Sequence, residues 1–315
     1  MLSRIAESLY WVGRYAERAE DTARILDVHV HHILEDPSVE EEVACRSLLD
    51  TMGADHPGGE VDTDAVTRVL ALDGDQPGSI VASLLAAREN ARGSREILSS
   101  EMWECLNATY HALDAQVERA GRRAPHSFFQ WVKERGAIVA GLADSTMTRD
   151  DAWRFLVLGR SLERVDMTAR LLRTCFADPS GAPDWITTLR SCSAQEAFLR
   201  TYRRAPDASL VVEFLLLDRL FPRSALHALD VAERRLSDLD PRGGRVGSKA
   251  EARKALGQVR TELEFSGVND LMEDLPSHLQ SLQEACAVAG EALARRFFHR
   301  TAAMEWEVEE ATARP

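Results

Sequence analysis

The sequence of 315 residues predicts an all-α protein, a duplicated helical bundle whose two halves are related by a pseudo-twofold axis. Three observations favour this fold class. Apolar residues recur at helical spacings of three and four along the chain, strand-type alternation is missing from the pattern, and a charged motif occurs twice. Leu, Ala, Arg and Glu dominate the composition, as is typical of helices that pack against helices.

The first predicted helix runs from Ser3, a suitable N-cap, to the dipeptide Asp36-Pro37, which ends it. Its apolar residues form a sustained heptad seam, as expected for a long helix packed nearly parallel to its neighbours. The seam consists of Leu2, Ile5, Leu9, Val12, Ala16, Ala19, Ala23, Leu26, Val30 and Ile33. Small residues in the middle of the seam allow a partner helix to approach closely.

The later elements are separated by Gly and Pro residues, which interrupt helices and mark turns. In chain order we expect short helices at 40–52 and 62–72, a long helix from 79 to about 119, a turn at 121–125, helices at 127–143, 149–177, 184–204 and 208–220, a helix from 222 to 239, a loop at 240–248, and two final helices.

An internal duplication is indicated by Trp11–Leu26 and Val157–Leu172, which share eight identities in sixteen positions at an offset of 146. The identical pairs are Gly13/Gly159, Arg14/Arg160, Glu17/Glu163, Arg18/Arg164, Thr22/Thr168, Ala23/Ala169, Arg24/Arg170 and Leu26/Leu172. A weaker match pairs 79–94 with 209–224, with four identities in sixteen. We therefore expect a first helical half at 1–145 and a second at 146–315, packed together.

The repeated motif places charged side chains three and four residues apart, where they are neighbours on a helix. One interpretation is a solvated face of intrahelical ion pairs, each worth about 0.2–0.5 kcal/mol. The other is a pair of sites, one per half, that use Glu17 and Glu163 as catalytic acid–base carboxylates or hold an amino or carboxylate group. The candidate binding residues of this motif are Arg14, Arg18, Glu20, Arg24, Arg160, Arg164, Asp166 and Arg170.

Gly13 and Gly159 stand in the middle of the two motif helices. A glycine inside a helix costs about 1 kcal/mol relative to alanine, so its presence twice requires a reason. We expect close contact between backbones at these positions, and packing explains such contact better than a ligand does.

A second charged constellation contains Arg88, Glu89, Arg92 and Arg95. On one continuous helix the three arginines share a stripe, where they are able to clamp a phosphate or a carboxylate. The alternative is ordinary pairing with Glu89 and with acids of neighbouring helices. Arg223 is a further anion-binding candidate, and the preceding proline at 222 suits the first position of a helix.

Several classes of function are disfavoured by the composition. The net charge of −13 argues against binding to nucleic acid or to an anionic membrane surface. The sequence has no Glu-x-x-His pair and no Gly-rich phosphate loop, so we expect neither a metal nor a cofactor.

The five scattered cysteines indicate reduced thiols, and charged residues interrupt the N-terminal apolar run, so we expect a cytoplasmic protein.

Several sequence blocks together resemble the alpha-E domain family of bacterial proteins. These blocks are Met1-Leu2-Ser3-Arg4, Leu9-Tyr10-Trp11, Gly13–Arg24, Ala87–Glu96, Ser100–Asn107, Leu158–Leu172 and Phe221–Ser224. The resemblance implies an all-helical protein encoded beside, or fused to, circularly permuted ATP-grasp ligases and transglutaminase-like cysteine peptidases. That association implies a system that makes and trims peptide or amide bonds.

Three functional hypotheses remain open. The first is an accessory subunit of an ATP-grasp amide-ligase system that recognises the ligase, a peptide or an acidic substrate through the Glu/Arg motifs and the arginine stripe. The second is an enzyme that uses Glu17 and Glu163 on a peptide or amino acid, which requires a cleft and raised pKa values. The third is a structural homo-oligomer without a ligand.

Overall fold

The computed structural model describes residues 2–35, 39–122, 125–177, 185–240 and 250–298, and every regular element in these ranges is a helix. The predicted all-α class is confirmed. The helices before residue 150 are α1 (Ser3–Glu35), α2 (Glu41–Met52), α3 (Thr63–Thr67), α4 (Ile80–Gly93), α5 (Ser100–Arg122) and α6 (His126–Thr146).

The helices of the rest of the chain include one long and several short elements. They are α7 (Asp151–Ala177), α8 (Trp185–Ser191), α9 (Gln195–Tyr202), α10 (Ala208–Val212), α11 (Ala225–Leu239), α12 (Glu251–Phe265), α13 (Val268–Glu273) and α14 (Leu275–Leu293). Three segments have the wider turn of a π-helix: η1 (Arg68–Leu72), η2 (Glu213–Leu217) and η3 (Ala294–Phe298).

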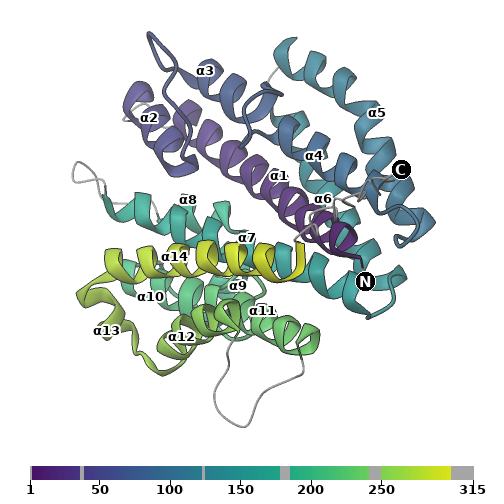
Figure 1. Ribbon diagram of the computed structural model, residues 1–315. Coiled ribbons are helices and arrows are strands. Elements are labelled where there is room, and N and C mark those ends of the chain that lie inside the picture. The colour runs from purple at the N-terminus through teal and green to yellow at the C-terminus, as the bar shows by residue number, and fades with distance from the viewer. Residues whose placement is uncertain (1, 36–38, 123–124, 178–184, 241–249, 299–315) are drawn as a thin grey trace, which may run out of the picture.

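The long helices α1 and α7 lie side by side where two groups of helices meet. In Figure 1, α1–α6 gather on one side of this junction and α8–α14 on the other. The helix α1 also packs against α4 and α6, and α7 packs against α11 and α14. Because the repeated motif lies on α1 and on α7, this packing brings its two copies together.

The crossing of α1 and α7 is close because two glycines meet the opposite backbone. A Cβ atom at Gly13 would lie 2.0 Å from the carbonyl oxygen of Leu156, and one at Gly159 would lie 2.1 Å from that of Tyr10. Neither position has room for any side chain. The expected close backbone contact at both glycines is therefore confirmed.

The same local structures occur before α4 and before α11. Asp62 caps α3 and Asp207 caps α10, and a π-helical segment follows each of these short helices. Ser79 then caps α4 and Ser224 caps α11, through hydrogen bonds from the backbone N–H groups of the first helical turns. The expected alignment of 79–94 with 209–224 is wrong, because Ser79 corresponds in its structural role to Ser224.

Serine caps and a left-handed residue divide segments that we expected to be continuous. The helix that starts after Ser79 ends at Gly93, and Ser99 begins α5 by accepting a hydrogen bond from the backbone N–H of Met102 at 3.1 Å. The expected helix at 184–204 is divided at Ser193, whose φ is 53°. Pro222 does not start a helix, since Ser224 is the N-cap of α11. From residue 241 on, the predicted loop lies outside the described residues. After it come α12, α13, α14 and η3, rather than two helices.

The described helices and the cysteines bear on membrane crossing and on disulfide bonding. Within the described residues, no helix combines the length and the apolar character that crossing a bilayer requires. All five cysteines lie among these residues, four of them are buried, and no disulfide joins them.

Candidate functional site

Glu163, on α7, is buried between two arginines of α1. Its carboxylate accepts from Arg14 Nε at 2.5 Å, from Arg18 Nε at 2.6 Å and from Arg18 Nη2 at 3.2 Å. Arg14 also donates to the hydroxyl of Tyr10 at 3.1 Å. The side chain of Glu163 is 1% exposed, so this ion pair lies in the helix interface and not on a solvated face.

Glu17, on α1, makes the reciprocal contacts with α7. Arg164 donates to its carboxylate through Nε and through Nη2, the latter at 3.2 Å, and Arg223 Nη1 lies 3.0 Å from its Oε1. Each motif glutamate is thus paired with the motif arginine of the other helix. The interpretation of these two glutamates as members of intrahelical pairs is wrong, because the interface buries them and presents the opposite arginines to them.

Arg223 joins three carboxylates of α1, which we call the carboxylate cluster (Glu17, Glu20 and Asp21). It donates to Asp21 Oδ1 through Nη1, and to Glu20 Oε1 at 2.6 Å through Nη2. Arg24 donates to the same oxygen of Glu20 at 2.6 Å. All three carboxylates are buried, so one guanidinium group and its neighbours balance a concentrated negative charge.

Both motif glutamates are ionised at neutral pH. Burial raises the pKa of Glu17, but Arg223 and Arg164 lower it more, and the net pKa is below the ordinary value. Burial likewise raises the pKa of Glu163, and Arg14 with Arg18 brings it below the ordinary value. The cavity beside Glu17 is ≈ 10 Å³, about the space of one water molecule. Neither carboxylate therefore has the raised pKa that the acid–base hypothesis requires, and the cavity beside Glu17 is too small for a substrate.

The pKa of Asp21, unlike those of Glu17 and Glu163, is above its ordinary value. Burial raises its pKa from 3.8 to about 7, opposed by Arg223 and supported by the negative charges of Glu17 and Glu20. It faces Arg164 of α7 and Cys192, which follows α8, and burial raises the pKa of that thiol to about 12. The motif spacing makes Asp21 a helical neighbour of Arg18, but Asp21 was not among the predicted site residues. The signal available there was its position three residues after Arg18 and next to Glu20.

The titration of Asp21 gives a pH-dependent prediction. A carboxyl group whose pKa is raised by folding stabilises the fold fully below its unfolded pKa, and this contribution is lost as the pH rises through about 7. Asp21→Asn keeps the shape and removes the charge. We expect wild type to lose stability relative to this variant between about pH 4 and 7, by at most about 1.4 kcal/mol per pH unit. Urea unfolding of both proteins across this range measures the difference, and parallel curves would refute the expectation.

The remaining motif residues differ in their contacts. Arg24–Glu20 at 2.6 Å and Arg170–Asp166 at 3.1 Å are intrahelical pairs, as the spacing predicts. Arg160 does not form an intrahelical pair. Its nearest ion-pair partner in the described chain is Asp144 Oδ2, on α6, at 3.7 Å. Burial and the neighbouring Arg164 lower the pKa of Arg160. Arg14 pairs with Glu163, but its duplicate Arg160 does not pair with Glu17. Arg223 pairs with Glu17 instead.

The second constellation does not form a stripe on one helix, because α4 ends before Arg95. Arg88 donates to Asn107 Oδ1 at 3.3 and 3.2 Å, and its guanidinium lies 4.6 Å from the ring centre of Tyr110. Arg88 and Arg95 both lie over Trp103, at 5.5 and 5.2 Å from the ring centre. We call Arg88, Arg95, Trp103 and Tyr110 the arginine–aromatic surface. The spacing of the arginines gives no sign of its two rings.

Arg92 and Glu89 lie beside the arginine–aromatic surface and form an exposed ion pair, their side chains being 61% and 58% exposed. Such a pair is worth little in water, so it leaves Arg92 available to another anion. Among the described residues, no group of three His, Cys, Asp or Glu side chains is arranged to hold a metal ion.

Comparison with known proteins identifies the family of the chain. Residues 1–298 match Alpha-E, described as a predicted alpha-helical domain with a conserved ER motif. Uncharacterized proteins of Mycobacterium bovis and Mycobacterium tuberculosis are 28% identical to it over 296 residues, which is 86% of this chain and 33% of theirs. The chain thus spans about a third of the length of these relatives, and no solved structure matches it. The chain belongs to the Alpha-E family.

Proposed function

We propose that the chain is a cytoplasmic accessory subunit of an ATP-grasp-type amide-ligase system, where it binds the ligase and acts together with a transglutaminase-like peptidase. The observation that carries this proposal is the arginine–aromatic surface, which is open to a partner, whereas the motif glutamates are buried and ionised. The mycobacterial relatives support it, because a region like this chain is about a third of each of those longer proteins.

The arginine–aromatic surface has the composition of a binding hot spot. Arg, Trp and Tyr are enriched where protein partners bind most strongly. Tyr110 is 38% exposed, and Arg92 and Arg95 are exposed as well. Stacking on Trp103 holds the guanidinium of Arg95 in place, so less side-chain entropy is lost on binding. An acidic segment of the ligase suits this surface.

The repeated motif has a structural role in this proposal. Its glutamates and arginines hold α1 against α7, and a duplication of one helical unit, with halves at 1–145 and 146–315, accounts for the reciprocal pairing. The matching caps at Ser79 and Ser224 support such a duplication at an offset of about 145. The motif then orients the two halves and, with them, the binding surface.

Affinity for the ligase tests the proposal. We expect Arg92→Ala combined with Arg95→Ala to weaken binding of an ATP-grasp-type ligase from the same organism by roughly tenfold or more, since removing arginines at a hot spot has effects of this size. Biolayer interferometry on purified proteins measures the change. The unfolding curve of the variant should match that of wild type, because both arginines are exposed.

The matched control replaces two other exposed arginines, Arg204, which pairs with Asp207, and Arg234, which pairs with Asp230. Arg204→Ala combined with Arg234→Ala should bind the ligase as wild type does. Equal weakening by both double variants would mean that only net charge matters. That result, or failure of wild type to bind the ligase, overturns the proposal.

A further inference from the structure

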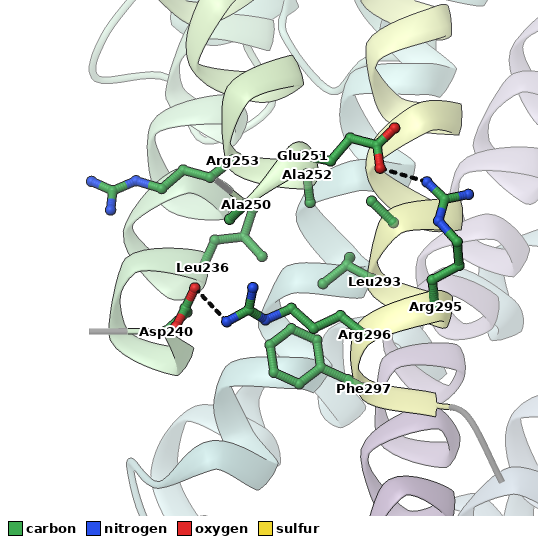
Figure 2. A pocket seen from close by; sticks show the side chains of 11 residues that line it. Leu236, Asp240, Ala250, Glu251, Ala252, Arg253, Leu293, Arg295, Arg296 and Phe297 are labelled. Atoms are coloured by element: carbon green, nitrogen blue, oxygen red, sulfur yellow. Dashed lines mark hydrogen bonds and ion pairs between the residues drawn. The ribbon is translucent and has the colours of Figure 1, made fainter. Parts of the chain in front are cut away.

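A pocket of ≈ 230 Å³ lies between the end of α11, the start of α12 and η3. Figure 2 shows Leu236, Ala252 and Leu293 around it, with the ring of Phe297 on the side of η3. These side chains form the apolar part of the lining. The charged residues of the lining are Asp240, Glu251, Arg253, Arg295 and Arg296. The pocket shares no residue with the ion pairs of α1 and α7 or with the arginine–aromatic surface.

One of the three arginines of the lining, Arg296, extends beside the apolar part of the pocket. The side chain of Arg296 extends from η3 toward α11, where its Nη2 lies 2.8 Å from Asp240 Oδ2 (Figure 2). Its guanidinium also lies 5.5 Å from the ring centre of Phe297. A guanidinium has five N–H donors, and within the described chain Asp240 is its one ion-pair partner. Arg296 is therefore able to donate to a second carboxylate.

The other charged groups at the pocket limit what it can hold. Arg295 is paired with Glu251 at 2.7 Å, and Figure 2 shows the guanidinium of Arg253 pointing away from the pocket. Because Asp240 and Glu251 already stand beside the two paired arginines, a ligand with a single negative charge fits better than a phosphate dianion. The start of α12 adds a favourable field for such an anion.

The size of the pocket indicates a small ligand. Its ≈ 230 Å³ is far more than the 10–15 Å³ or so that one water needs, and less than the roughly 300–1,000 Å³ of pockets for drug-sized ligands. We infer that this pocket binds a small apolar carboxylate, with an aliphatic group against Leu236 and Leu293 and the carboxylate on Arg296. The terminal residue of a peptide belongs to this chemical class.

Ligand-observed NMR titration of the full chain with N-acetyl-leucine tests the inference. We expect saturable binding of this acid and at least roughly tenfold weaker binding of N-acetyl-leucinamide, which lacks the charge. Arg296→Gln should weaken binding of the acid by a similar factor. Arg296 is 49% exposed, so this variant should fold as wild type does. Arg253→Gln is the matched control and should leave binding unchanged.

Four results would overturn the inference. Equal binding of the acid and the amide would show an apolar pocket without carboxylate recognition, and would overturn the inference. Competition by inorganic phosphate at equal concentration would show a general anion site, with the same consequence. Unchanged binding in Arg296→Gln, or no binding by wild type, would also refute it. None of these outcomes bears on the ligase binding proposed above, which is measured through other residues.

Discussion

Glu163→Gln is expected to lower the free energy of unfolding by about 3–5 kcal/mol, the usual result of breaking a buried ion pair by removing one partner. The substitution keeps the size of the side chain but removes its charge. Arg14 and Arg18, whose side chains are 14% and 23% exposed, would then lack their anion in the helix interface. The hydroxyl of Tyr10 is neutral and cannot replace it.

Urea unfolding at pH 7 measures this change, with Glu89→Gln as the control. Glu89 also pairs with two arginines, but its side chain is 58% exposed, so its loss should change stability by less than about 0.5 kcal/mol. A loss below about 1 kcal/mol for Glu163→Gln would contradict the view that this pair holds α1 and α7 together.

Gly13→Ala is expected to destabilise the fold by about 3 kcal/mol or more, because the added methyl group has no space. It would stand 2.0 Å from a backbone oxygen of α7, and a backbone atom moves only if the whole helix shifts. Such a shift would also lengthen the ion pairs of Glu17 and Glu163. Differential scanning calorimetry should show a lower unfolding temperature, and Gly159→Ala should behave in the same way.

Gly141→Ala is the matched control for the glycine at the crossing. Gly141 also lies inside a long helix, α6, but a Cβ atom there would meet nothing within 4 Å. Alanine should therefore stabilise the protein by roughly 0.5–1 kcal/mol through its better helix propensity. If both substitutions shifted stability in the same direction, close packing at Gly13 would not be the cause.

Two features that depend on local residues or on periodic spacing were predicted correctly from the sequence. The heptad seam predicted α1, and the cost of a mid-helix glycine predicted the close contact at Gly13 and Gly159. The end of α4 was missed although Ser94 and Ser99 were visible as cap residues, because the apolar seam was followed across them.

The site was predicted only in part, because its glutamates pair with arginines that are far away in the sequence. The spacing of the motif predicts partners on one helix, but burial at the crossing gives Glu17 and Glu163 partners on the other. Arg223 is 202 residues from Asp21, and no sequence pattern links the two positions. The raised pKa of Asp21 follows from that meeting, so it was visible only in the folded chain.

The reciprocal pairing makes each long helix depend on the other for electrical neutrality. Neither α1 nor α7 supplies the arginines that neutralise its own motif glutamate, since Arg14 and Arg18 serve one and Arg164 with Arg223 serves the other. A change of sign in one helix is therefore tolerated only with a compensating change in its neighbour. We expect charge changes at the motif positions of one helix to be accompanied by charge changes on the other.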